Sequence, residues 1–127
     1  WRSLEAAYRN SPYFEYYEDE LQFIFEERPK HLFELNLTTT QAVCNLLQIP
    51  FEPNITEEYS KTSDDVDLRG AWNKKPYKEA PPASSFPSYI QVFSDRFDFT
   101  PDLSILDLLF CIGPQSIDYL NSLELRH

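Results

Sequence analysis

The chain has 127 residues and a formal net charge of −10, from 11 Lys and Arg against 21 Asp and Glu. This balance is the opposite of that expected for a nucleic-acid-binding domain, and an anionic membrane surface would repel it. Hydrophobic residues make up 42% and aromatic residues 16% of the sequence, which excludes a disordered chain and suffices for one packed core. The longest apolar run, 105–112, is too short to cross a bilayer, so we expect no membrane insertion.

The beginning of the chain, up to residue 49, is predicted to be helical. Apolar side chains recur at helical spacing over 1–8 and again after Ser11 and Pro12, which are a typical N-cap and first helical residue. A third helix is predicted over about 31–48. The run of threonines at 38–40 is a poor helix-forming sequence, and it predicts a kink or break there.

The segment 50–87 is polar, rich in Pro and irregular, with one short strand predicted at 55–59. Residues 88–93 alternate between two faces and predict a second strand. Because alternate residues of a strand share a face, we expect Tyr89 and Gln91 to point the same way.

A helix at 104–112 is the best-defined element. Ser104 and Asp107 form an S-x-x-D capping box at its start, and Gly113 with Pro114 ends it. Nearly every residue between these caps is apolar, which predicts a helix buried on all sides.

Together the patterns predict a mainly α fold of four to five helices around the helix at 104–112, with at most a small β element. A last amphipathic helix is predicted over 114–125. We expect a single domain over 1–127, made of a helical half (1–49), an irregular connection (50–87) and a strand with helices (88–127).

Motifs for cofactors and metals are missing from the sequence. With 2 Gly there is no Gly-rich phosphate loop, and the His and Cys residues lack zinc-site spacing. Cys44 and Cys111 lie in apolar helical patterns and are predicted to be buried free thiols. The acidic stretch 64–67 could bind a hard cation but lacks the calcium-loop pattern. We therefore predict no cofactor and no metal.

The start of the helix at 104–112 is the candidate site. A helix N-terminus attracts anions, and nearby arginines can supply full positive charge. Asp107 is the candidate catalytic residue, as a buried carboxylate able to take a proton. The predicted ligand-binding residues are Arg9, Asn10, Arg69, Tyr89, Gln91 and Ser104. A structural interpretation stands beside this one, in which Ser104 and Asp107 only cap the helix and the arginines make surface contacts.

Several blocks resemble the WbqC-like protein family. Residues 1–17 (WRSLEAAYRNSPYFEYY) are similar to its W/H-x-S-I/L-x-x-A-Y-x-N-S-P-Y-F block, and the segments 67–69, 89–93, 101–110 and 113–114 follow in the family's order. The resemblance runs over essentially the whole chain. In that family the first block normally follows an upstream segment, so this chain is predicted to be the C-terminal part of a member.

The resemblance also implies a function. Members of the family occur among bacterial surface-polysaccharide genes, which implies cytoplasmic work on an amino sugar or a nucleotide-activated sugar. The implied reaction is transfer of an amino-acyl or similar group. Two positions depart from the family pattern, Asp102 and Cys111, where Asn is common. The alternative is a non-catalytic helical binding or protein-interaction module. No oligomeric state is predicted.

Overall fold

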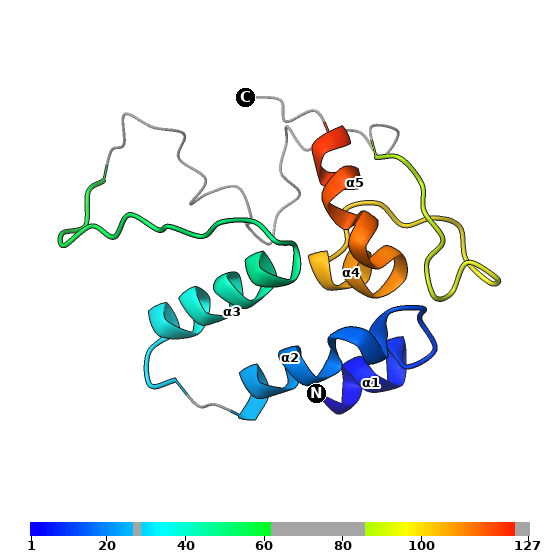
Figure 1. Cartoon of the computed structure of the whole chain (residues 1–127), viewed down its shortest axis with the longest axis horizontal. Coiled ribbons are helices and arrows are strands. Elements are labelled where there is room, and N and C mark those ends of the chain that lie inside the picture. Colours follow the sequence, from blue (N-terminus) through cyan, green and yellow to red (C-terminus); the bar gives the residue numbers. More distant parts are fainter. Residues whose placement is uncertain (27–28, 62–85, 124–127) are drawn as a thin grey trace.

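The computed structural model describes residues 1–26, 29–61 and 86–123. The described residues form helices and no strand, so the predicted mainly α fold is confirmed. In chain order the elements are α1 (Arg2–Tyr8), α2 (Phe14–Glu26), α3 (Leu32–Leu46), α4 (Ile105–Ile112), the 3₁₀ helix η2 (Gly113–Gln115) and α5 (Ser116–Ser122), as Figure 1 shows.

The core is built around aromatic rings that α1, α2 and α4 contribute. Phe14 and Phe110 are fully buried, with ring centroids 5.0 Å apart, and Tyr8 lies 5.1 Å from Phe110. Trp1 stacks on Phe14 at 5.7 Å. Such ring pairs each add about 0.5–1.5 kcal/mol beyond the burial of their area. The rings therefore join α1, α2 and α4, although α4 is far from α1 in sequence.

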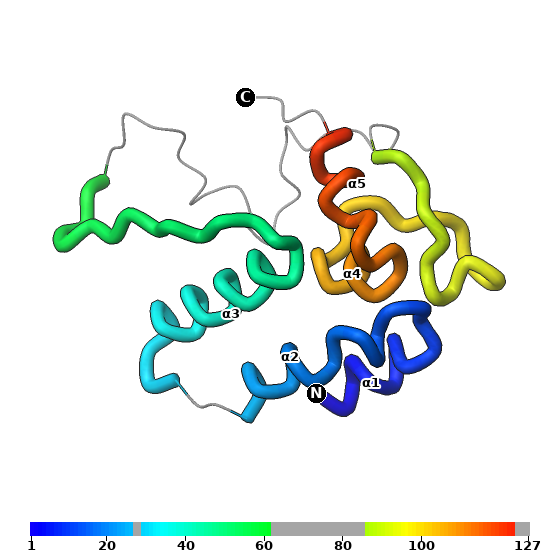
Figure 2. The backbone as a smooth tube through the Cα atoms, viewed as in Figure 1, coloured from blue at the N-terminus to red at the C-terminus, as the bar shows by residue number. Residues whose placement is uncertain are grey.

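Helix α4 is the central element, as predicted. Residues 107–111 are all buried, and the helix lies between α2 on one side and α5 on the other (Figure 2). Ser104 caps it, because the Ser104 hydroxyl accepts a hydrogen bond from the Leu106 N–H at 3.3 Å. At its end Gly113 has φ +54°, and a Cβ there would lie 2.5 Å from the Tyr13 ring. Both the backbone and the close approach require glycine at this position.

The two predicted strands are wrong. Residues 55–59 and 88–93 carry no strand, and 92–96 form a turn. The Gln91 N–H donates to the Ser94 hydroxyl at 2.8 Å, and the Gln91 carbonyl accepts from the Ser94 N–H at 3.1 Å. Because this local turn uses the backbone groups of Gln91, they are not available to a neighbouring strand.

Two predictions about helix ends and breaks are also corrected. The Ser11 hydroxyl donates to the Tyr8 carbonyl at 2.7 Å and so closes α1, while α2 begins only at Phe14. Helix α3 continues through the threonines without a break. The hydroxyls of Thr39 and Thr40 donate to carbonyls one turn earlier, at 2.9 and 2.7 Å, which keeps these side chains compatible with the helix.

The last predicted helix, over 114–125, is divided. Pro114 lies in η2, and the α-helical part is α5 alone, which ends at Ser122.

The two cysteines differ in exposure. Cys111 is buried and Cys44 half-buried, and both are free thiols. Within the ranges that the structure describes, no helix has the length and apolar character needed to cross a membrane.

Candidate functional site

Asp107 lies at the centre of a polar cluster that joins three segments of the chain. It is 3% exposed. Its Oδ1 accepts a hydrogen bond of 2.9 Å from the Tyr8 hydroxyl, and its Oδ2 accepts one of 2.6 Å from the Tyr89 hydroxyl. The Gln91 side-chain amide also donates to Oδ2, at 3.2 Å. Three donors thus satisfy a carboxylate that would otherwise be costly to bury.

The partners of Asp107 are themselves held in place. The Gln91 amide nitrogen donates to the Thr100 carbonyl, and its oxygen accepts from the Thr100 N–H, both at 2.9 Å. The Tyr89 ring packs edge-on against Phe99 and Tyr119, with centroids 5.2 and 5.3 Å apart. Contacts from outside α4 therefore hold the partners of Asp107 in position.

Burial and the neighbouring carboxylate change the acidity of the groups around Asp107. Burial raises the pKa of the Tyr8 and Tyr89 hydroxyls far above their ordinary value of 10.0, and the hydrogen bonds to Asp107 raise it further. Both hydroxyls therefore keep their protons and remain donors at neutral pH. Burial, as the larger cause, and the charge of Asp107, as the smaller one, raise the pKa of the Cys111 thiol to about 11. A thiol of this kind is a poor nucleophile.

A cavity of about 170 Å³ lies beside the cluster. Its polar lining includes Tyr8, Gln91 and Asp107, although Asp107 is almost fully covered. Its apolar lining includes three side chains that are 45–68% exposed: Phe93, Phe97 and Leu103. A small number of convergent polar groups among apolar side chains is typical of small-molecule sites.

The structure brings together three of the predicted site residues, Tyr89, Gln91 and Asp107. Gln91 lines the cavity, whereas Tyr89 is not among its described lining residues and contacts the carboxylate from another side. Ser104 serves as the N-cap of α4. The predicted reciprocal capping by Asp107 is wrong, because the Asp107 carboxylate accepts from the tyrosines and the glutamine instead.

The predicted cationic part of the site lies elsewhere or is not described. The Arg9 guanidinium donates to Glu5 at 2.5 Å and to Glu18 at 2.8 Å, and it lies 5.0 Å from the centre of the Phe14 ring. Asn10 is exposed in the turn after α1. Among the described contacts, none joins Arg9 or Asn10 to Asp107. Arg69 and the acidic stretch 64–67 lie outside the described residues.

Tyr8 is the site residue that the sequence did not reveal. It is 99 positions from Asp107, and its spacing within α1 indicated only an apolar helix face. In the part of the chain that the structure describes, no group of three or more His, Cys, Asp or Glu side chains could hold a metal ion.

The model of the WbqC-like protein family matches residues 1–86, about two-thirds of the sequence. The chain belongs to the WbqC-like protein family. The match includes α1, α2 and α3, and with them Tyr8, but it ends before Tyr89, Gln91 and Asp107. No curated protein and no solved structure matches the chain.

The extent of this match corrects one prediction. It lies in the N-terminal part of this WbqC-like chain and not over essentially all of it, so the later blocks at 89–93 and 101–110 fall outside. It also gives no support to the prediction that the chain corresponds to the C-terminal part of a member.

One departure from the family pattern has a backbone explanation. Asp102 has φ +56°, a conformation that Asn and Asp adopt more readily than other residues with a side chain.

Proposed function

We propose that this WbqC-like chain binds an amino sugar, free or nucleotide-activated, at the cavity beside Asp107. The proposed role is that of a cytoplasmic transferase that adds an amino-acyl or similar group to this sugar during the biosynthesis of a bacterial surface polysaccharide. Family membership supports the general assignment. The observation that carries the proposal is the buried Asp107 carboxylate, which lines a cavity together with Tyr8 and Gln91.

The lining offers suitable chemistry for an amino sugar. The Asp107 carboxylate accepts hydrogen bonds, so it can take one from an ammonium group or a hydroxyl of a sugar. The exposed rings of Phe93 and Phe97 offer apolar faces for the C–H groups of the sugar ring. A polar group at the inner wall and apolar groups around it would fix the orientation of such a ring.

The volume of the cavity restricts what enters it. At about 170 Å³ it is smaller than the roughly 300–1,000 Å³ of pockets for drug-sized ligands. A nucleotide-activated sugar would therefore place only its sugar part beside Asp107, and the nucleotide would remain outside.

In the proposed reaction the amino nitrogen of the sugar, in its neutral form, forms a bond to the carbonyl carbon of an activated acyl group through its lone pair. The nitrogen loses a proton to Asp107, and the acyl group loses its former leaving group with the bonding electron pair. Tyr8 and Tyr89 hold the carboxylate in position for this proton transfer. The role of Asp107 is thus general base.

A thermal-shift screen tests the proposal. Free amino sugars and nucleotide-activated amino sugars are added to the chain, with the corresponding nucleotides alone as controls. A ligand at a hundredfold over its Kd should stabilise the fold by about 2.7 kcal/mol. Stabilisation by the amino sugars and not by the nucleotides is expected. No stabilisation by any sugar would contradict the proposal and favour the non-catalytic binding module.

A further inference from the structure

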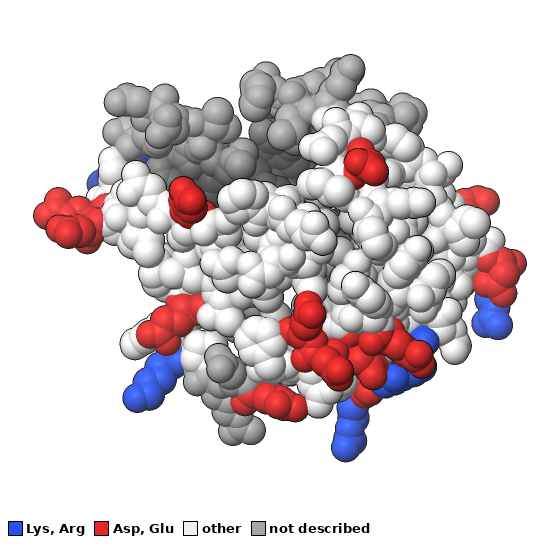
Figure 3. All heavy atoms as spheres, viewed as in Figure 1, with Lys and Arg blue, Asp and Glu red and all other residues white. Residues whose placement is uncertain are grey.

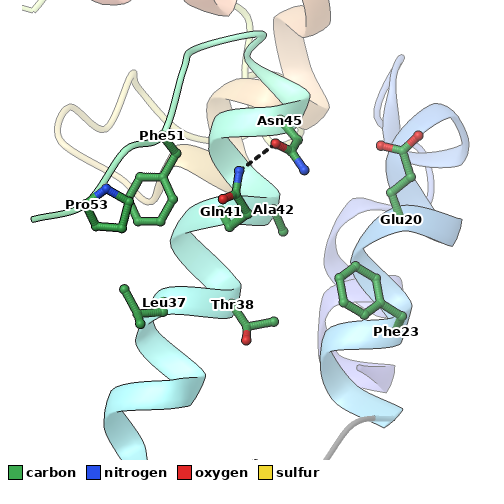
Figure 4. A pocket seen from close by; sticks show the side chains of 9 residues that line it. All are labelled: Glu20, Phe23, Leu37, Thr38, Gln41, Ala42, Asn45, Phe51 and Pro53. Carbon is green, nitrogen blue, oxygen red and sulfur yellow. Dashed lines mark hydrogen bonds between the residues drawn. The ribbon is translucent and has the colours of Figure 1, made fainter. Parts of the chain in front are cut away.

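A second and larger hollow lies away from Asp107, between α2 and α3. It is a groove of about 780 Å³, and Figure 4 shows the side chains that line it. They come from α2, from α3 and from the segment after α3, and are Glu20, Phe23, Leu37, Thr38, Gln41, Ala42, Asn45, Phe51 and Pro53. Neither α4 nor the polar cluster contributes to this lining, so the groove is separate from the proposed sugar site.

The groove has apolar side chains along its two sides and a polar pair between them (Figure 4). Phe23 on α2 lies across the groove from Leu37 on α3, and Phe51 and Pro53 lie beside α3 (Figure 4). Phe23 is 39% exposed. Between the two apolar sides, the Gln41 amide donates to the Asn45 side-chain oxygen at 2.8 Å, so these two groups partly satisfy each other. The groove therefore offers apolar area more than hydrogen bonds.

The two helices that form the groove are acidic. Helix α2 contains Glu15, Glu18, Asp19, Glu20 and Glu26 and no Lys or Arg, and the only charged residue of α3 is Glu34. Glu20 is exposed and belongs to the groove itself. Figure 3 shows acidic side chains gathered over the part of the surface where α1 and α2 lie, with a smaller number of Lys or Arg side chains among them. A partner with positive charge beside its apolar face would complement this surface.

The form of the partner follows from the backbone of the groove walls. The N–H and C=O groups within α2 and α3 are paired inside each helix, so these two walls offer no ladder to an extended peptide. In the remaining wall, formed by Phe51 and Pro53, Pro53 has no N–H to donate. A partner seated on such walls must satisfy its own backbone groups, and a helix does so. Apolar side chains of a helix at every third or fourth position would reach the centre of the groove.

We propose that this groove binds an amphipathic helix of a partner protein, with Lys or Arg flanking its apolar face. The surface recruits that partner by charge and holds it by burial of apolar side chains around Phe23 and Leu37. This interaction is independent of the sugar site, because the two regions share no lining residue.

A designed peptide tests this proposal by fluorescence anisotropy. The probe is a labelled helical peptide of about four turns, with Leu at every third or fourth position and Lys elsewhere. A second peptide carries Ser in place of each Leu and has the same charge. At about 0.15 M salt, where exposed charges are well screened, the Leu peptide should bind at least tenfold more tightly than the Ser peptide. Equal affinity of the two peptides would mean that net charge alone accounts for the binding, and it would overturn the proposal.

Two charge-reversal variants locate the site on the chain. Glu20→Lys and Glu15→Lys make the same change in the same helix, and both side chains are exposed, but only Glu20 lines the groove. We expect Glu20→Lys to weaken binding of the Leu peptide at least fivefold and Glu15→Lys to change it less than twofold. Phe23→Ala should weaken it tenfold. Equal effects of the two charge reversals, or no effect of Phe23→Ala in a folded protein, would place the peptide elsewhere and refute the proposal.

Discussion

The Asp107 cluster and the α2–α3 groove use polar groups in opposite ways. At the cluster a charged side chain is buried, and three protein donors hold both of its oxygens. At the groove the charges lie on the border and in solvent, while apolar side chains such as Phe23 remain partly exposed. A buried charge needs hydrogen-bond partners within the fold, or its burial destabilises the protein. Exposed apolar area is removed from water only when a partner covers it. The cluster therefore contributes to stability even without a ligand, and the groove contributes little.

The largest expected effect is a difference in unfolding free energy between a variant of the aromatic core and a variant of the exposed start of α3. Phe110→Ala removes a fully buried ring that contacts Tyr8 and Phe14, and it should lower the free energy of unfolding by about 3–5 kcal/mol. Phe33→Ala removes a ring that is 56% exposed and should change it by less than about 0.5 kcal/mol. Urea unfolding of both variants measures the difference. Similar losses would mean that α3 is packed as tightly as α4.

Asp107→Asn tests the cluster itself. The amide oxygen can take the place of only one carboxylate oxygen and so accepts from one tyrosine, while the N–H₂ group faces the hydroxyl of the other. Since the site is buried, we expect a loss of about 1–3 kcal/mol in unfolding free energy. The matched change Asp118→Asn alters an exposed carboxylate on α5 and should have little effect. A loss no larger than that of Asp118→Asn would show that the hydrogen bonds to Asp107 do not stabilise the fold.

Alkaline pH should weaken the cluster in a defined direction. The pKa of Tyr8 and of Tyr89 is raised in the folded state, so their contribution is complete below pH 10 and is lost as the pH rises above it. The Cys111 thiol adds to this loss between its ordinary pKa of 9.0 and about 11. The unfolding free energy should therefore fall as the pH rises from 9 upward. The slope should be shallower in Tyr89→Phe, and an unchanged slope in that variant would exclude Tyr89 as a source.

Ser104→Ala gives the smallest effect that is still readily measured. Because the Ser104 hydroxyl accepts from the Leu106 N–H at the start of α4, its loss should cost about 1 kcal/mol. Ser104→Gly should cost only a few tenths. Thermal unfolding of the two variants distinguishes loss of an N-cap from a more general effect. Equal and larger losses in both would indicate that Ser104 has another contact.

Part of this architecture was predictable from local sequence. The caps of α4 are local signals, and Ser104 and Gly113 behave as expected. Tyr89, Gln91 and Asp107 were predicted to meet, although the strand on which that argument rested does not form. The two side chains still meet, because the Gln91 amide lies 3.5 Å from the Tyr89 hydroxyl and both donate to Asp107 Oδ2, so the conclusion did not depend on a sheet.

Other features depend on contacts between distant segments. Tyr8 meets Asp107 across 99 positions, and nothing in α1 indicates this partner. Arg9 was assigned to the site, yet Glu5, one turn earlier on the same helix, is a local competitor for its charge. The apolar pattern of the helix predicted over 31–48 did not distinguish residues that pack in the core, such as Leu47, from Phe33, which is largely exposed.

The central claim is that Asp107 recognises the amino group of a sugar, and a double comparison of Kd values tests it most directly. Calorimetric titration gives the Kd of an amino sugar and of the corresponding sugar with a hydroxyl in place of the amine, for the wild type and for Asp107→Asn. We predict that the wild type prefers the amine at least tenfold, about 1.4 kcal/mol, and that Asp107→Asn loses this preference while remaining folded. A preference of the same size in both proteins would contradict the claim.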